Sequence, residues 1–312
     1  MAETPDIEQL YVHESIGNKI PKDAFVDALS DLPPGVELVG DGHEYGRTDA
    51  IASFAPRPEF LDAGWVHCIR AGYDAFDTDA YEAAGVAFTN STGIHGTTVS
   101  ELALEMMLSF ARLGHRYRDQ QRKNEWVEPP YERPFTLENE SICVVGLGTI
   151  GEAIATRCDA LGMDVTGVRR SSEPVPGVSE LLSPDRLGEA IEEARFVALA
   201  TPHTPETTNL VGGPEFDRMR DDSYLINVAR GGVVDEDALI DALESGEIAG
   251  AGLDVFETEP LPSDSPLWDF EEAIITPHRG SATNRYHLDL AELFGENVRR
   301  CLSGEGLKNR IV

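Results

Sequence analysis

The chain has 312 residues, which exceeds the size at which one hydrophobic core keeps growing, and this length predicts two domains. Its 56 acidic and 25 basic residues give a net charge of −31, which excludes nucleic acids and anionic membranes as partners. The apolar runs are too short to cross a bilayer and the acidic start lacks the features of a secretory signal, so a soluble cytoplasmic protein is expected.

Two further features of the composition bear on the environment. Only four of the basic residues are lysines, and surplus carboxylate with so little lysine is typical of halophilic proteins, in which high salt screens self-repulsion. The four cysteines, Cys68, Cys143, Cys158 and Cys301, form no metal-binding spacing. We therefore expect reduced, mostly buried thiols and no metal site.

In the first part of the chain, short apolar runs of strand length alternate with helical patterns. The runs are 10–16, 36–40, 50–55, 65–70 and 86–90. Six more follow in the second part, at 141–147, 164–168, 196–200, 224–229, 251–256 and 273–277. Alternating strands and helices predict an α/β protein with two Rossmann-like domains built on parallel sheets.

Two helices join the two sets of strands. Residues 97–121 show an apolar face at helical spacing, which indicates either core packing or, for 97–113, the interface of a homodimer. A last helix from 286 to 302 is expected to return to the first domain. The predicted domains are a discontinuous substrate domain, 1–96 with 287–312, and an inserted dinucleotide-binding domain, 97–286.

A glycine-rich turn follows the strand at 141–147. Gly146 permits a tight turn, Gly148 allows a pyrophosphate to approach, and Gly151 allows close packing of helix on strand. Amide groups at the helix start, around Thr149 and Ile150, then face the phosphates. Strand, turn and helix together predict a dinucleotide site.

Basic residues stand where an enzyme that uses NAD carries an acid. Arg169 occupies that place, and Arg170 and Ser171 follow. Guanidinium groups pair with a 2′-phosphate in a forked, charge-assisted geometry, so NADP(H) is expected to be preferred over NAD(H). The alternative is two solvated surface arginines.

Five segments, in order and spacing, resemble the D-2-hydroxyacid dehydrogenases over nearly the whole chain. They are AGYDAFD from Ala71, VVGLGTIG from Val144, LINVARGGVVDEDAL from Leu225, GLDVFETEPLP from Gly252 and TPHRGSAT from Thr276. The resemblance implies reduction of small 2-keto acids to D-2-hydroxy acids by hydride transfer.

The resemblance also implies the roles of individual residues. Arg230, Glu259 and His278 would form the catalytic centre: His278 exchanges the proton, Glu259 favours its imidazolium form, and Arg230 contacts the substrate. Ala71 and Gly72 would bind the substrate carboxylate together with Arg230 and His278. The cofactor cleft would be lined by Thr201, Pro202 and Ala229, with Asp254 orienting the nicotinamide amide.

Some residues depart from the family pattern, and one other function stays open. Arg70 stands where many relatives have glycine, and Arg279 follows His278 in place of a small apolar residue. Taken singly, His278 and Glu259 are ordinary surface residues; their joint occurrence at strand ends favours chemistry. The alternative function is a dinucleotide-sensing scaffold without turnover.

Overall fold

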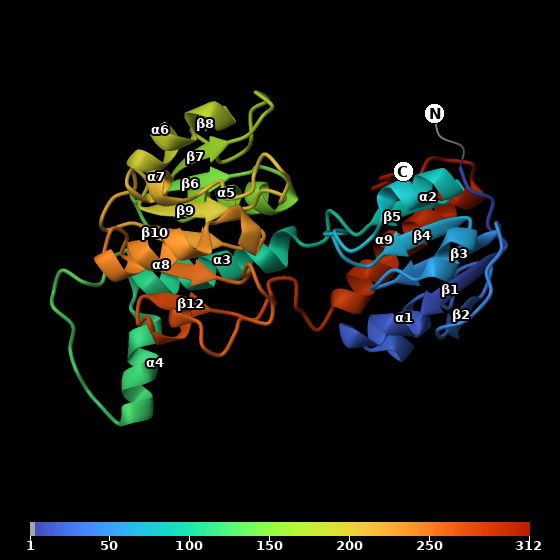
Figure 1. The fold of residues 1–312 in the computed structure, drawn as a ribbon, viewed down its shortest axis with the longest axis horizontal. Helices are drawn as coiled ribbons and strands as arrows, with labels where there is room; N and C mark the ends of the chain where they lie inside the picture. The colour runs from blue at the N-terminus through green and yellow to red at the C-terminus, as the bar shows by residue number, and fades with distance from the viewer. Residues whose placement is uncertain (1–3) are drawn as a thin grey trace. The chain divides into compact units, whose positions relative to one another are not determined.

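The computed structural model describes residues 4–312 and divides into two compact units (Figure 1). One unit comprises Met1–His95, as far as it is described, with Ala282–Val312, and the other comprises Gly96–Ser281. The second boundary thus lies earlier than the expected 286/287. The reason is local, since the Tyr286 hydroxyl donates to the carbonyl of Ile69 at 2.9 Å and lies 2.9 Å from Nε2 of His95, both in the first unit.

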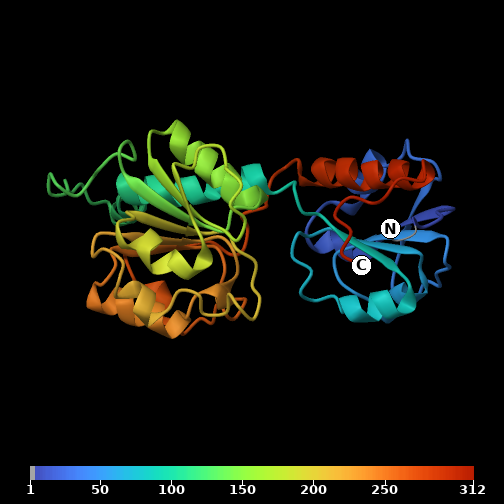
Figure 2. The same cartoon turned by 90° about the horizontal axis from the view of Figure 1, so that it is seen from above.

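The first unit is a five-stranded parallel sheet in the order β2-β1-β3-β4-β5. Its strands are β1 (Gln9–His13), β2 (Val36–Val39), β3 (Asp49–Ser53), β4 (Trp65–Cys68) and β5 (Ala87–Asn90). Helices α1 (Lys22–Ala28) and α9 (Tyr286–Leu302) cover one face and α2 (Thr78–Ala84) covers the other (Figure 2). Strands β3, β4 and β5 are buried on both faces, as their continuous apolar runs predict, whereas edge strand β2 exposes Glu37 and Leu38.

The second unit is a seven-stranded parallel sheet in the order β12-β11-β10-β9-β6-β7-β8. Its strands are β6 (Ser141–Val145), β7 (Asp164–Val168), β8 (Glu180–Leu182), β9 (Phe196–Leu199), β10 (Tyr224–Asn227), β11 (Gly250–Leu253) and β12 (Ala273–Ile275). The α/β class is confirmed. Edge strand β8 was not expected, because its sequence, ELL, contains only two apolar residues.

Helices pack on both faces of this sheet, and each face has its own core. On one face, α3 (Gly96–Ala111) and α5 (Thr149–Ala160) bury apolar side chains such as Met106 and Ile154. On the other, α6 (Leu187–Glu192), α7 (Gly213–Phe216) and α8 (Glu236–Ser245) bury side chains such as Ile191 and Leu239. The glycine turn before α5 is therefore supported by core packing below it.

The helix expected over 97–121 is two helices. α3 ends at Ala111 and α4 (Gly114–Lys123) follows it, because Leu113 adopts the left-handed conformation with φ 57°. The Ser109 hydroxyl accepts a hydrogen bond from the amide of His115 at 3.0 Å and fixes the break. No side chain of α4 is buried in this chain.

Several expected absences concern the described residues only. Within 4–312 no helix is both long and apolar enough to cross a membrane. In the same range, no group of three or more His, Cys, Asp or Glu side chains is arranged to hold a metal ion. All four cysteines are buried and free.

Candidate active site

The glycine turn links β6 to α5, and two of its three glycines have no space for a side chain. Gly146 has φ +90°, and a Cβ there would lie 2.8 Å from the backbone of Thr201, which follows β9. A Cβ on Gly151 would overlap the carbonyl oxygen of Gly146. At Gly148 the space is open, and α5 begins at the next residue. The turn therefore fits a pyrophosphate, because its exposed backbone meets solvent at a helix start of positive polarity.

The two arginines after β7 each have a carboxylate nearby. Arg169 Nη1 lies 3.7 Å from Oε1 of Glu152, in the first turn of α5, and its side chain is only 20% exposed. Arg170 is exposed, and its charge contributes to lowering the pKa of the Glu206 carboxyl, after the larger effect of the Thr204 hydroxyl. Arg169 thus lies beside the first turn of α5, and Arg170 is open to solvent.

His278 and Glu259 are in direct contact. Oε2 of Glu259 lies 2.7 Å from Nδ1 of His278, and Oε1 accepts a hydrogen bond from the amide of Phe256 at 3.2 Å. Glu259 therefore has both oxygens engaged, one on the imidazole and one on its own loop. This leaves Nε2 of His278 free to exchange a proton, with the side chain 46% exposed.

Asp254 anchors the loop that carries His278. Its Oδ1 accepts from the Thr276 hydroxyl at 2.6 Å and the Arg279 amide at 2.8 Å, and its Oδ2 accepts from the Gly280 amide at 2.8 Å. Asp254 is only 2% exposed. These bonds hold His278 in the left-handed conformation, φ 50°, which is unfavourable for a residue other than glycine.

Arg230 lies on the loop that follows β10, next to the loop of Glu259. Its Nη1 donates to the carbonyl of Ala229 at 2.7 Å. A Cβ on Gly231 would overlap the carbonyl group of Phe256, so the two loops touch through their backbones. Arg230, Asp254, Glu259 and His278 therefore all follow the neighbouring strands β10, β11 and β12 at one edge of the sheet.

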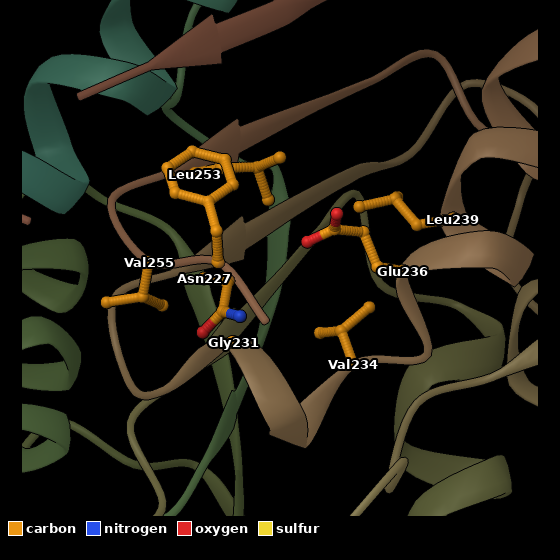
Figure 3. A pocket seen from close by; sticks show the side chains of 8 residues that line it. Asn227, Gly231, Val234, Glu236, Leu239, Leu253 and Val255 are labelled. Atoms are coloured by element: carbon orange, nitrogen blue, oxygen red, sulfur yellow. The ribbon is translucent and has the colours of Figure 1, made fainter. Parts of the chain in front are cut away.

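A small, mainly apolar pocket lies beside this edge (Figure 3). It is lined by Asn227, Gly231, Val234, Glu236, Leu239, Leu253, Val255 and Phe256. Of these lining residues, only Glu236 is ionisable. Its carboxylate accepts a hydrogen bond from the amide of Glu257 at 3.1 Å.

Two residues of this edge were missed by the sequence-based reasoning. Asn227 is 1% exposed; its amide nitrogen donates to the carbonyl of Arg230 at 3.1 Å, and its oxygen accepts from the amide of Ala229 at 3.1 Å. Thr276 binds Asp254, as described above. A polar residue ending an otherwise apolar strand was the only signal for Asn227.

Ala71 and Gly72, the expected carboxylate loop, lie in the first unit after β4. Three consecutive carbonyls there accept hydrogen bonds: Ile69 from the Tyr286 hydroxyl, Arg70 from the Ser91 amide, and Ala71 from the Asn90 side chain. Among residues 4–312, the amide groups of Ala71 and Gly72 have no acceptor. The loop is therefore pinned through its carbonyls, with two amide donors left to bind an anion.

Comparison with known proteins relates these features to a family. Residues 104–280 match the model for the D-isomer specific 2-hydroxyacid dehydrogenase NAD binding domain. The chain is 36% identical over 245 residues to glyoxylate/hydroxypyruvate reductase B of Pectobacterium carotovorum, covering 77% of this chain and 76% of that protein. It is 35% identical over 242 residues to glyoxylate reductase of Korarchaeum cryptofilum, covering 75% and 71%.

The fold is also similar to solved structures. The D-isomer specific 2-hydroxyacid dehydrogenase of Xanthobacter autotrophicus Py2, in complex with NADPH and MES, aligns with a TM-score of 0.82 at 30% identity, covering 98% of each chain. The extent of these matches and the glycine turn lead to one conclusion. The chain belongs to the D-isomer specific 2-hydroxyacid dehydrogenase family and is an NAD(P)-dependent dehydrogenase.

Proposed function

We propose that the enzyme reduces small 2-keto acids reversibly to D-2-hydroxy acids and prefers NADP(H). The observation that carries the proposal is the 2.7 Å contact between Glu259 and His278, which leaves one imidazole nitrogen free for proton transfer. Relatives named glyoxylate/hydroxypyruvate reductase support a small 2-keto acid as the substrate.

Each residue of the proposed catalytic centre has its own role in the reduction. Bound NADPH supplies the hydride. Nε2 of His278 donates a proton to the carbonyl oxygen, while Glu259 stabilises the imidazolium and fixes its orientation. Arg230 offers a fixed positive charge to the carboxylate and to the developing charge on the oxygen. The free amides of Ala71 and Gly72 bind the substrate carboxylate.

The residues proposed to bind the cofactor lie on the glycine turn and on the loops near it. The residues proposed to hold NADP(H) are Gly146, Gly148, Thr149, Ile150, Gly151, Arg169, Arg170, Ser171, Thr201, Pro202, Ala229 and Asp254. Their fit is supported by the open space at Gly148 and the exposed start of α5. The discontinuous unit serves as the substrate domain and the inserted unit as the cofactor domain.

A substrate panel tests the reaction. With NADPH, we expect turnover of glyoxylate, hydroxypyruvate or pyruvate, and His278→Ala should lower kcat by about 10²- to 10⁴-fold. Glu259→Gln should also lower kcat steeply, because an amide cannot both accept from the imidazole and keep its bond to the amide of Phe256. The control Glu257→Gln removes the same charge from an exposed neighbour and should leave kcat unchanged. Binding of NADPH without turnover of any keto acid would favour the alternative, a dinucleotide-sensing scaffold.

The cofactor preference has its own test. Arg170→Ala should raise the Kd for NADP⁺ by tenfold or more and change the Kd for NAD⁺ little, because a phosphate loses a charge-assisted partner. The control is Arg186→Ala, an exposed arginine that pairs with Glu189. Tighter binding of NAD⁺ than of NADP⁺ by the unmodified enzyme would contradict the preference.

We also propose a cytoplasmic homodimer formed through the helix around 97–113. Leu108 is 44% exposed on α3, and Trp126 and Tyr131, beyond α4, are 95% and 94% exposed. Burying these apolar side chains against a second copy would stabilise both. Light scattering should give a dimer for the unmodified chain and a monomer for Leu108→Glu. The control Leu288→Glu, at an equally exposed leucine of α9, should remain dimeric.

The acidic surface supports adaptation to high salt. With a net charge of −31, self-repulsion falls as salt screens the carboxylates, so the melting temperature should rise with KCl concentration. A melting temperature that is highest at low salt would contradict this.

A further inference from the structure

Two cations share the ring of Phe54 in the first unit. The Cζ atom of Arg70 lies 4.7 Å and Nζ of Lys19 lies 5.6 Å from the centre of the ring. Phe54 directly follows β3, Arg70 closely follows β4, and Lys19 ends the short 3₁₀ helix after β1. All three therefore lie at the carboxyl ends of neighbouring strands, where open parallel sheets bind their ligands.

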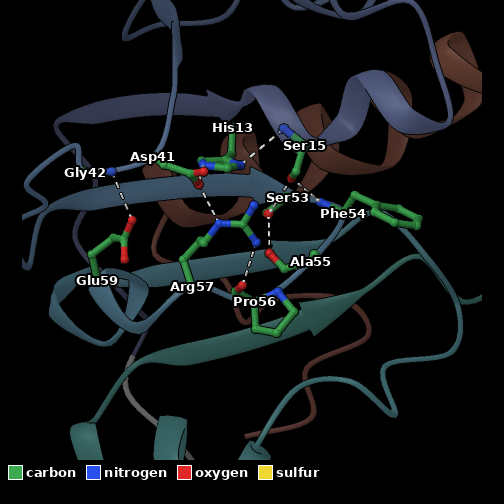
Figure 4. A network of polar contacts seen from close by, with 10 residues as sticks. All are labelled: His13, Ser15, Asp41, Gly42, Ser53, Phe54, Ala55, Pro56, Arg57 and Glu59. Carbon is green, nitrogen blue, oxygen red and sulfur yellow. Dashed lines mark hydrogen bonds and ion pairs between the residues drawn. The ribbon is translucent and has the colours of Figure 1, made fainter.

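Hydrogen bonds fix the backbone that carries the Phe54 ring (Figure 4). The amide of Phe54 donates to the Ser15 hydroxyl at 3.3 Å, and that hydroxyl lies 3.2 Å from the hydroxyl of Ser53. The Ser53 hydroxyl donates to the carbonyl of Ala55 at 2.7 Å. The backbone at Phe54 is thereby tied to the end of β3 and to the 3₁₀ helix that follows β1.

The two cations differ in their partners from Arg57, which follows the same strand as Phe54. Arg57 pairs with Asp41 at 2.5 Å, and Asp41 also lies 3.2 Å from His13 (Figure 4). Neither Arg70 nor Lys19 has an acidic partner within residues 4–312, and Nε of Arg70 is buried without a hydrogen bond.

The nearby thiol does not supply the missing negative charge. Burial raises the pKa of Cys68, which outweighs the opposing effect of Arg70, so the thiol remains neutral at neutral pH. In a chain of net charge −31, acids are plentiful, yet these two cations are without one. An anionic ligand would provide the negative charge that Arg70 and Lys19 lack.

We propose that Arg70 and Lys19 bind the second carboxylate of a short 2-keto dicarboxylic acid. The inference rests on the proposed function, in which the amides of Ala71 and Gly72 hold the carboxylate next to the keto group. A guanidinium that lies on an aromatic ring keeps its edge N–H groups free for a bidentate carboxylate. Arg70 directly precedes Ala71, so the guanidinium and the two amides belong to one loop, and 2-keto dicarboxylic acids of four or five carbons are the substrates to test.

The experiment compares substrates of equal length that differ in one carboxylate. The pairs are oxaloacetate with 2-ketobutyrate and 2-ketoglutarate with 2-ketovalerate, measured with NADPH at one fixed salt concentration. For the unmodified enzyme, kcat/KM should be higher for the dicarboxylate of at least one pair. In Arg70→Met, which keeps an unbranched apolar stem over Phe54, the dicarboxylate-to-monocarboxylate ratio should fall by about 10- to 100-fold.

Three further variants separate charge from structure. Lys19→Met should lower the same ratio by a smaller factor, because Lys19 is exposed. Arg70→Lys keeps the charge and should restore part of the ratio. Lys22→Met removes an equal charge from the exposed start of α1 and should leave the ratio unchanged.

The outcomes distinguish this inference from the proposed function. If the unmodified enzyme turns over monocarboxylates but the ratio is the same in Arg70→Met, the inference is wrong and the proposed function stands. Equal losses for both members of a pair would also overturn it, since Arg70 would then only support the loop. If no 2-keto acid is reduced, the proposed function fails.

Discussion

Asp254→Asn tests whether the buried carboxylate acts through the loop that carries His278. The carboxylate accepts three hydrogen bonds, two on Oδ1 and one on Oδ2. An amide has one acceptor oxygen and one donor group, so at least one backbone amide of Arg279 or Gly280 would face an NH₂ group. The substitution is nearly equal in volume, which leaves hydrogen bonding and charge as the only changes.

The size of the effect follows from burial. A buried donor left without an acceptor costs about 1–3 kcal/mol, and Asp254 is 2% exposed. For a unit of this size each kcal/mol lowers the melting temperature by about 2–4 °C. His278 has φ 50°, so weaker anchoring should let the loop relax. A displacement of the imidazole by about 1 Å can lower kcat by about 100-fold.

The assay combines calorimetry, steady-state kinetics and titration with NADPH. We expect a lower melting temperature, a kcat reduced by about 10- to 100-fold, and a smaller change in the Kd for NADPH. The control Asp264→Asn removes the same charge from an exposed position in the preceding loop. If kcat and melting temperature are both unchanged, the anchoring role is refuted. If only the Kd for NADPH changes, Asp254 acts on the nicotinamide instead.

Three other substitutions probe the glycine turn and a buried histidine. Gly151→Ala should lower the melting temperature and weaken NADPH binding, because the added Cβ would overlap the carbonyl of Gly146. Gly148→Ala should weaken NADPH binding at an unchanged melting temperature, because the space at Gly148 is open. Calorimetry and NADPH titration measure both effects, and the same result for the two variants would contradict this prediction. Burial lowers the pKa of His67 to about 3, whereas in the unfolded chain the pKa of a histidine is about 6.5. Between these two values the unfolded chain binds a proton at His67 and the folded chain does not. Stability should therefore fall by up to about 5 kcal/mol between pH 6.5 and 3. The free energy of unfolding in urea should therefore fall more steeply for the unmodified chain than for His67→Gln as the pH is lowered over that range. A difference between the two that does not change with pH would contradict the assignment.

The strands were predictable because buried parallel strands consist of continuous apolar runs. This holds for β4 and β9, in which every residue is buried. Edge strand β8 has one buried residue, Leu182, and therefore gave no signal. The break after α3 was missed for a different reason: the apolar face continues through Leu113, and the helix ends through the left-handed conformation of that residue and the bond of the His115 amide to the Ser109 hydroxyl.

The candidate site was predictable in its residues but not in its contacts. The glycines could be understood from local chemistry, since Gly146 and Gly151 have no room for a side chain. The set of Arg230, Glu259 and His278 came from family resemblance, because no local pattern says which strand ends are neighbours. The three bonds of Asp254 to the His278 loop depend on the pairing of β11 with β12, which a single sequence does not contain.

The distribution of the residues between the two units has a consequence for specificity. The glycine turn, Arg230, Asp254, Glu259 and His278 all belong to Gly96–Ser281, and the contacts that position the acid–base pair come from that unit alone. The amides of Ala71 and Gly72, with Arg70 and Lys19, belong to the other unit. On the proposed function, we expect substitutions around Phe54 to change which keto acid is bound without disturbing the contact between Glu259 and His278. On the same proposal, selection for a new substrate would act on the loops of the first unit, because the contact proposed for proton transfer lies within the second.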